Sequence, residues 1–350
     1  MNVNEVPSMR TYKTTRHRCT YELTYPLTKQ QQMVSKQICH HVAHHQSVLT
    51  YAVCGAGKTE LVMEVIKNHL NEGKKVGFAI SRRQVVLEIQ QRMQEAFKEI
   101  NVIAVCEGYN DVVDGDLIVC TMHQLYRYYQ TFDLLIMDEV DAFPYRNNEV
   151  LKQIATHACK GVMIYLTATP DEEMLESTKR NEIQMVELFQ RPHGYPLIEP
   201  DIKVLPKQLQ ILFLTQFLFQ QKKRKIQTLV FVPTIQMANE LSLKLRIFFR
   251  CKAFTSKSED KEHIIDDFHK KKYECLITTT ILERGITIKG IYIIVVQADH
   301  PVFNEASLTQ IIGRVGRNIE MPTGKGIFLC VKKTRDIERC AKAIKKMNER

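Results

Sequence analysis

Short apolar runs that do not alternate strictly with polar residues recur along the chain, and amphipathic stretches separate them. A strand of this kind is buried on both faces, as in a parallel sheet covered by helices. The succession of strand and helix predicts an α/β fold whose mostly parallel sheets are flanked by helices. In the first half we predict strands over residues 47–53, 75–80, 101–105, 117–120, 134–137 and 162–166, and helices over residues 57–70 and 83–97.

A stretch dense in residues that break helices and strands interrupts this succession. It covers residues 190–206, where four prolines and Gly194 predict a linker. The chain is therefore predicted to comprise an N-terminal extension (residues 1–24), a first lobe (residues 25–196) and a second lobe (residues 197–350). In the second lobe we predict strands over residues 228–232, 275–279, 292–296 and 326–331, and helices over residues 235–249, 307–315 and 335–349.

The composition has a basic excess. Among 350 residues, 49 are Lys or Arg and 39 are Asp or Glu, which gives a net charge of +10. Because contacts to phosphate release counterions, such an excess favours a polyanionic partner. A basic protein without such a partner is the alternative that charge alone leaves open.

Neither a membrane span nor an export signal is expected. The most apolar run, residues 211–219, is broken by Thr215 and Gln216 and falls short of the roughly 20 residues that a spanning helix needs. The first residues include Glu5 and Pro7 and lack the apolar core of a signal peptide. The ten cysteines form no CxxC pair, which favours free thiols in a reducing compartment. We therefore expect a cytoplasmic protein.

The strongest local motif reads AVCGAGKT and lies between a predicted strand and a predicted helix. This is the context that a phosphate-binding loop requires, because its glycines let backbone N–H groups approach phosphate oxygens. Lys58 is expected to reach the β- and γ-phosphates, and Thr59 to ligate Mg²⁺. A chance glycine-rich turn is the alternative. The predicted ATP-binding residues of this loop are Ala52, Val53, Cys54, Gly55, Ala56, Gly57, Lys58 and Thr59.

Two adjacent carboxylates follow the apolar run at residues 134–137. The carboxyl end of a buried strand is where an α/β sheet keeps its ligand groups. We expect Asp138 to hold Mg²⁺ through water and Glu139 to polarise the attacking water. An acidic turn at the surface is the alternative, which the phosphate-binding loop upstream makes the weaker of the two.

A third motif, QIIGRVGR, occupies residues 310–317 of the second lobe. Arg314 and Arg317 are three residues apart, and we expect them to share one helical face. Two guanidinium groups in that arrangement can meet a γ-phosphate as arginine fingers do. With Gln310 they complete the predicted catalytic set, although an isolated segment of this kind is more often a basic loop.

Weaker motifs stand at the ends of predicted strands, and each of them alone reads as an ordinary turn. Thr167 and Thr169 are expected to couple the ATP state to contact between the lobes. Hydroxyl and basic side chains elsewhere are expected to contact a nucleic-acid backbone. Those residues are Ser81, Arg82, Arg83, Thr121, His123, Thr234, Thr279 and Thr280.

Two further clusters stay open on the sequence alone. The histidines between residues 40 and 45 have helical spacing, which suits a transition metal or, more commonly, a polar helix face. The basic run at residues 222–225 suits a DNA contact about as well as a solvated surface.

Taken in order, these segments resemble the motifs of superfamily 2 helicases. AVCGAGKT resembles motif I, SRR motif Ia, DEVD motif II, TAT motif III, TTTILERG motif V and QIIGRVGR motif VI. The resemblance implies two tandem RecA-like lobes with ATP bound in the cleft between them. It also implies that Gln31, in the segment LTKQQ, contacts the adenine, and that Gly285 in motif V belongs to the ATP site.

Within that superfamily, GAGKTE, DEVDAFPY and LTATP are most similar to the ComFA family. The resemblance implies an ATP-driven motor that moves single-stranded DNA during natural transformation of Gram-positive bacteria. It further implies competence proteins as partners and a peripheral location on the inner face of the cell membrane. The sequence departs from the family at its four-cysteine zinc module, because only Cys19 precedes Cys39 here.

Three alternatives to that function stay open on the sequence. The core motifs suit a replication-restart helicase of the PriA type as well as an RNA helicase, because they do not report on contacts to the 2′-hydroxyl. An inactive basic scaffold is the alternative from outside enzymology. The intact set of Lys58, Asp138, Glu139, Arg314 and Arg317 argues against it.

Overall fold

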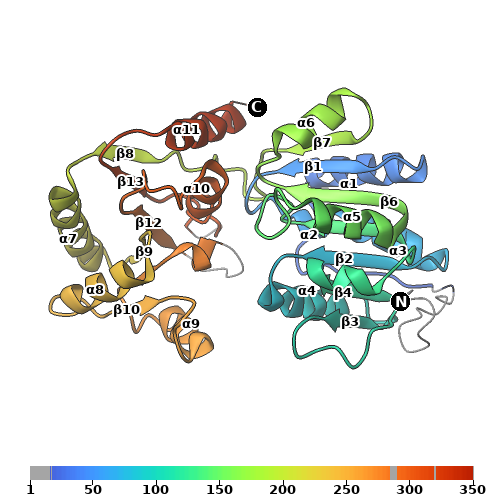
Figure 1. The fold of residues 1–350 in the computed structure, drawn as a ribbon, viewed down its shortest axis with the longest axis horizontal. Helices are drawn as coiled ribbons and strands as arrows, with labels where there is room; N and C mark the ends of the chain where they lie inside the picture. Colours follow the sequence, from blue (N-terminus) through green and yellow to red (C-terminus); the bar gives the residue numbers. More distant parts are fainter. Residues whose placement is uncertain (1–15, 17, 284–289, 319–320, 350) are drawn as a thin grey trace. The chain divides into compact units, whose positions relative to one another are not determined.

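The computed structural model describes residue 16 and residues 18–283, 290–318 and 321–349. The chain divides into two compact units, Met1–Pro192 and His193–Arg350, which are described separately below. Both units are α/β, with a parallel sheet and helices packed against it (Figure 1). The predicted fold class is therefore confirmed.

The sheet of unit 1 has seven strands in the order β3-β4-β2-β5-β6-β1-β7, and every pairing is parallel. Its central strands are apolar on both faces, as the sequence pattern predicts; in β2 and β4, for example, the buried residues are consecutive. The strands are β1 (Val48–Ala52), β2 (Val76–Ile80), β3 (Val102–Val105), β4 (Leu117–Thr121), β5 (Phe132–Asp138), β6 (Cys159–Thr167) and β7 (Gln184–Leu188).

Six α-helices and one 3-10 helix (Met122–Arg127) belong to the described part of unit 1. Each long one buries an apolar stripe, as Val85, Ile89 and Met93 do in the fourth helix. The helices are α1 (Lys29–Ala43), α2 (Lys58–Leu61), α3 (Met63–Asn71), α4 (Arg83–Ala96), α5 (Glu149–Ala158) and α6 (Glu172–Lys179). The single helix predicted over residues 57–70 is wrong in one respect, because Val62, with φ −99° and ψ 0°, separates α2 from α3.

The sheet of unit 2 has six strands in the order β10-β11-β9-β12-β13-β8, again all parallel. Its strands are β8 (Asp201–Val204), β9 (Gln227–Phe231), β10 (Cys251–Phe254), β11 (Cys275–Thr278), β12 (Ile291–Val295) and β13 (Gly326–Cys330). Its helices are α7 (Lys207–Arg224), α8 (Ile235–Leu245), α9 (Lys261–His269), α10 (Glu305–Ile312) and α11 (Arg335–Asn348).

The linker predicted over residues 190–206 is wrong in its second half. Strand β8 lies inside it and pairs with β13, with Ile202 opposite Phe328. An edge strand pairs on one side only, so it needs few apolar residues, and prolines can flank it without costing a ladder hydrogen bond. Pro200 and Pro206 stand in those flanking positions.

All ten cysteines are free thiols. Nine are buried and Cys39 is half-buried. Burial raises the pKa of the Cys39 thiol and of the Cys159 thiol to about 11. Within the residues that the structure describes, no helix combines the length and the apolar character needed to cross a bilayer.

Candidate functional site

The phosphate-binding loop leaves β1 at its carboxyl end and enters α2. Gly55 and Gly57 have φ values of 82° and 80°, in the left-handed region that favours glycine. A Cβ on Gly57 would lie 2.7 Å from Nε2 of Gln31, so the loop also needs a residue without a side chain there. The backbone is thereby fixed in the conformation that exposes amide groups to a ligand.

Lys58 and Thr59 open α2 beside this loop. The Lys58 ammonium donates to the backbone oxygen of Ala52 at 3.1 Å, which holds the cation over the loop. Thr59 is buried, with an exposed fraction of 7%. Both side chains therefore lie at the loop whose phosphate-binding role the sequence predicts.

Gln31 ties the first helix to the loop. Its Nε2 donates to the backbone oxygen of Ala56 at 2.8 Å, and its Oε1 accepts from the backbone nitrogen of Thr28 at 2.9 Å. The second bond is half of a capping box that starts α1. The glutamine predicted to contact adenine is thus positioned by the helix start and contacts the loop directly.

Asp138 ends β5, and Glu139 follows it with a φ of 55°. The Asp138 carboxyl is buried and accepts from the backbone nitrogen of Glu139 at 2.8 Å. Burial, and then the charge of Glu139, raise the pKa of Asp138 well above its usual range, while the Lys58 ammonium opposes the rise. The two carboxylates and the lysine therefore share one electrostatic environment.

The donor set fits Mg²⁺, since a hydroxyl of Thr59 and a buried carboxylate of Asp138 are hard oxygen ligands. A cation there would offset the cost that burial imposes on the Asp138 charge. In the described ranges no group of three or more His, Cys, Asp and Glu side chains is placed to hold a metal. A magnesium ion at this site would therefore depend on phosphate oxygens and water for its other ligands.

Ser81, predicted to contact nucleic acid, lies beside the predicted catalytic base. Its hydroxyl donates to Oε2 of Glu139 at 3.3 Å. The sheet register explains the contact, because Ala79 of β2 is paired with Met137 of β5, and Ser81 and Glu139 each come two residues later. A predicted nucleic-acid contact and a predicted catalytic group are thus in direct contact.

Asp141 joins the segment after β5 to the end of β6, a link that sequence reasoning missed. Its two carboxylate oxygens accept from the hydroxyls of Thr167 at 2.9 Å and of Thr169 at 2.7 Å. The backbone nitrogen of Thr169 also donates to the Thr167 hydroxyl at 3.0 Å. Motifs II and III are therefore bonded together, and the last letter of DEVD was the only sequence signal for it.

Arg191 is the second residue that sequence reasoning missed. Its side chain is 2% exposed, and its Nε donates to the backbone oxygen of Cys54 at 3.0 Å. The guanidinium therefore helps to fix the backbone of the phosphate-binding loop at Cys54. Its position among the prolines that predicted a linker concealed this role.

The predicted nucleic-acid residues lie at the carboxyl ends of strands in both units. Ile80 of β2 is paired with Thr121 of β4, which brings Thr121 near the segment Ser81–Arg83. In that segment Arg83 donates from Nε to the backbone oxygen of Glu107 at 2.7 Å. The others are Arg82 and His123 in unit 1, with Thr234, Thr279 and Thr280 after β9 and β11 of unit 2.

Gln310 lies in α10, but the helical face predicted for Arg314 and Arg317 is wrong. The helix ends at Ile312, and Gly316 has a φ of 68°, which a continuing helix does not permit. Arg314 therefore lies in the turn after the helix, and Arg317 lies just beyond that turn. Arg314 is buried, and Arg317 donates from Nε to the backbone oxygen of Gly313 at 3.1 Å. Gly285 lies outside the described residues.

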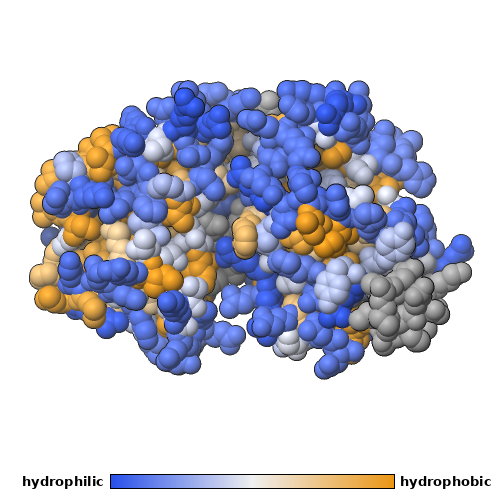
Figure 2. Space-filling model, in the orientation of Figure 1, coloured by the Kyte–Doolittle hydropathy of each residue, from blue (hydrophilic) through white to orange (hydrophobic). Residues whose placement is uncertain are grey.

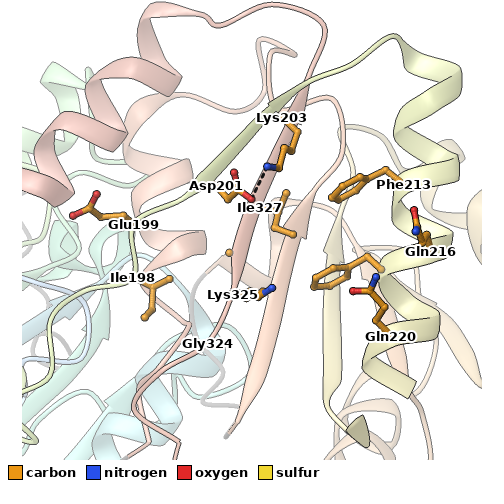
Figure 3. A pocket seen from close by; sticks show the side chains of 12 residues that line it. Ile198, Glu199, Asp201, Lys203, Phe213, Gln216, Gln220, Gly324, Lys325 and Ile327 are labelled. Carbon is orange, nitrogen blue, oxygen red and sulfur yellow. Dashed lines mark ion pairs between the residues drawn. The ribbon is translucent and has the colours of Figure 1, made fainter. Parts of the chain in front are cut away.

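None of the predicted site residues lines a cavity of about 430 Å³ in unit 2. It lies between α7 and the amino-terminal ends of β8 and β13, and Figure 3 shows the Asp201–Lys203 ion pair (3.1 Å) on its wall. Ligands of parallel sheets bind at the carboxyl ends of the strands. This cavity is therefore not the predicted nucleotide site.

Sequence comparisons decide the family. Residues 24–172 match the family described as type III restriction enzyme, res subunit, and residues 209–319 match the helicase conserved C-terminal domain. Competence protein ComFA of Streptococcus pneumoniae is 35% identical, over 92% of this chain and 77% of that protein. The chain belongs to the ComFA family. The ComFA of Bacillus subtilis is 32% identical, over 92% of this chain and 72% of that protein.

The family places the chain among superfamily 2 helicases, as the motifs predict, and makes it a nucleotide-binding, nucleic-acid-dependent ATPase of the helicase type. Among solved structures, Saccharomyces cerevisiae Dbp5 bound to RNA and ADP BeF3 is similar with a TM-score of 0.66 and 17% identity. That match covers 92% of this chain and 91% of Dbp5. At this identity the likeness shows the fold alone, which is that of a two-lobed RecA-like helicase.

Proposed function

We propose that the chain is an ATP-driven translocase for single-stranded DNA and that it works in DNA uptake during natural competence. Two ComFA relatives that carry the name "competence protein" are the support for the biological role. The support for the chemistry is the arrangement of the phosphate-binding loop, the two carboxylates and the strand-end hydroxyls in unit 1.

One observation carries the proposal: the 3.3 Å hydrogen bond from Ser81 to Glu139. The hydroxyl occupies an oxygen of the carboxylate that has to activate water. A DNA phosphate that accepts from the same hydroxyl would release that oxygen. The DNA phosphate and the Glu139 carboxylate then compete for one donor, so binding of DNA frees Glu139 to activate water and hydrolysis depends on nucleic acid.

In unit 1, Lys58 contacts the β- and γ-phosphates of ATP, and Gln31 reads the adenine. Thr59 and Asp138 would hold Mg²⁺, which would supply positive charge to the phosphates. Glu139 orients the attacking water and accepts its proton. The loop residues Ala52 to Gly57 present backbone amides to the phosphates, with Gly55 and Gly57 setting the conformation.

In unit 2, Gln310, Arg314 and Arg317 are assigned to the γ-phosphate, and Gly285 to the nucleotide. An arginine finger stabilises charge that develops in the transition state, so it acts on the rate more than on affinity. Asp141, the last residue of motif II, accepts hydrogen bonds from the hydroxyls of Thr167 and Thr169. This bonded segment is the proposed route by which the state of the nucleotide reaches motif III.

In each unit, the single-stranded DNA is expected to contact the carboxyl ends of the β-strands, mainly through its phosphates. Backbone contacts carry little sequence information, so binding is expected to be general. The net charge of +10 is expected to make affinity fall with salt, with about 0.7 logarithmic units per phosphate contact for single strands. The proposed contacts are Ser81, Arg82, Arg83, Thr121, His123, Thr234, Thr279 and Thr280.

The DNA-uptake role places the chain in the cytoplasm, peripheral to the inner face of the cell membrane, with other competence proteins as partners. The test of function is the ATPase rate of the full chain with single-stranded DNA, duplex DNA or RNA added separately. We expect stimulation by single-stranded DNA that weakens steeply with salt. An RNA preference of about tenfold or more would favour the RNA helicase instead. Stimulation confined to branched duplexes would favour a restart helicase.

A further inference from the structure

Exposed apolar side chains gather where α7 and α8 end in unit 2. We call this the aromatic patch, and it consists of Phe219, Leu243, Ile247 and Phe248. Their exposed fractions are 42%, 63%, 78% and 51%. The rings of Phe219 and Phe248 lie 5.8 Å apart, which joins the two segments. Figure 2 shows hydrophobic surface on the side of unit 2 where Figure 1 places α7 and α8.

Clustered exposed apolar surface of this kind marks interaction sites, whereas single exposed apolar residues are normal. Nearer the start of α7, Leu209 and Leu212 are also exposed, at 48% and 65%, but they lie outside the patch. Leu209 and Leu212 are one turn apart, and the exposed Gln216 separates them from Phe219. A solvent-facing helix surface ordinarily carries polar residues at such positions.

The rim of the patch is strongly basic. Residues 219–225 and 240–250 contain seven Lys or Arg residues and one Glu. The nearby Glu274 pairs with Lys222 at 3.5 Å and with Arg250 at 3.7 Å, which leaves the rim with a large positive excess. Charge complementarity therefore calls for an acidic occupant. This rim contains the basic run at residues 222–225 whose role the sequence leaves open.

The patch lies at the amino-terminal ends of the strands, opposite the carboxyl ends to which the ATP and DNA contacts are assigned. Helix α7 ends at Arg224, just before β9 begins at Gln227, and α8 ends at Leu245, before β10 begins at Cys251. These are amino-terminal strand ends. Thr234 and Thr279, by contrast, follow carboxyl ends of the same sheet. Nucleic acid held at the carboxyl ends does not account for the patch.

The rim is also positionally fixed. The Lys222 ammonium donates to the backbone oxygen of Phe248 at 2.9 Å and lies 5.6 Å from the ring centroid of the neighbouring buried Phe249. A membrane surface needs only cations that can snorkel, whereas a folded partner needs cations at defined positions. The fixed lysine beside the rings favours a protein.

We propose that the aromatic patch docks an acidic amphipathic helix of a partner protein. An apolar ridge with i, i+3, i+4 spacing would lie against Phe219, Leu243 and Ile247, and Asp or Glu side chains beside the ridge would meet the basic rim. The interaction serves recruitment and is separate from the ATP and DNA contacts proposed above.

The test uses the full chain and synthetic helical peptides with a leucine ridge flanked by glutamates, or by lysines in the matched peptide. We expect the glutamate peptide to bind more tightly by about tenfold or more, with an affinity that falls with salt. Leu243→Ser combined with Ile247→Ser should weaken binding by about tenfold or more, as loss of an interface anchor does. Both side chains are mostly exposed, so the fold should persist.

Val150→Ser in α5 is the matched control, because Val150 is 66% exposed on a helix of the other unit. It should leave peptide affinity unchanged, and all variants should keep ATPase stimulation by single-stranded DNA. Equal affinity for the two peptides, or no binding, would overturn the proposal. A third result would also overturn it: the chain binds phosphatidylglycerol vesicles but not phosphatidylcholine vesicles, and the double variant abolishes this binding. The patch would then be a membrane contact.

Discussion

Ser81→Ala removes the hydroxyl that donates to Glu139 while leaving the phosphate-binding loop and both carboxylates in place. We expect hydrolysis of ATP without nucleic acid to rise, because the Glu139 oxygen becomes free to orient water. A hydrogen bond to a charged group contributes about 1.5–3 kcal/mol. At 3.3 Å this bond is longer than the usual O–H···O distance, so we assign it a smaller free energy of about 1–1.4 kcal/mol. Its loss then corresponds to a rise of about five- to tenfold in the basal rate of hydrolysis.

The assay is phosphate release as a function of single-stranded DNA concentration, with Ser81→Thr as the control that keeps the hydroxyl. The rate at saturating DNA should stay near that of the parent, so the stimulation ratio should fall by the factor that the basal rate gains. An unchanged basal rate with weaker DNA binding would make Ser81 a DNA contact only. A rate that falls with and without DNA would mean that Ser81 orients Glu139, and our reasoning would be refuted.

Four further substitutions test the rest of the site. Lys58→Ala should abolish turnover without unfolding unit 1, since the ammonium serves phosphates rather than a core; normal phosphate release would remove the loop assignment. Glu139→Gln should bind ATP yet hydrolyse it very slowly, and a collapse of nucleotide affinity in a fluorescent-ATP titration would contradict the division of roles. Arg317→Ala should keep ATP affinity and lower the DNA-stimulated rate by about 10³-fold or more, whereas an unchanged rate would exclude a finger. Asp141→Ala should destabilise unit 1 by about 2–4 kcal/mol through two lost bonds from threonine hydroxyls, measured as faster local hydrogen exchange around Thr167; unaltered exchange would show that the bonds contribute nothing.

The sequence predicts the central strands well because burial on both faces leaves a pattern in a short window. Strand β2 is an uninterrupted apolar run, and its carboxyl end falls within the predicted span. Edge strands escape prediction for the opposite reason. Strand β8 has no buried residue, and in β7 only Val186 and Leu188 are buried, so neither produces a continuous apolar signal.

Contacts in the site also fall into those that the sequence predicts and those that it does not. The motif letters predict which residues gather at the phosphate-binding loop, since each motif follows its own strand. The bond between Ser81 and Glu139 depends on the pairing of β2 with β5, which are separated by more than 50 residues in sequence. Arg191 reaches the loop from 137 residues away, which no local pattern can reveal. The turn that carries Arg314 depends on the backbone conformation at Gly316, which the letters GRVGR leave open.

Each unit contains buried thiols whose chemical reactivity depends on whether that unit has opened. Cys120 is in β4 of unit 1 and Cys275 is in β11 of unit 2, and both are fully covered by surrounding residues. An alkylating reagent reacts with the thiolate, so it is blocked by the fold and again by the raised pKa of each thiol. A brief pulse of such a reagent therefore modifies Cys120 or Cys275 only in molecules in which the sheet that contains it has opened. Alkylation of Cys120 and of Cys275 can therefore measure the opening of each unit separately, without any engineered label.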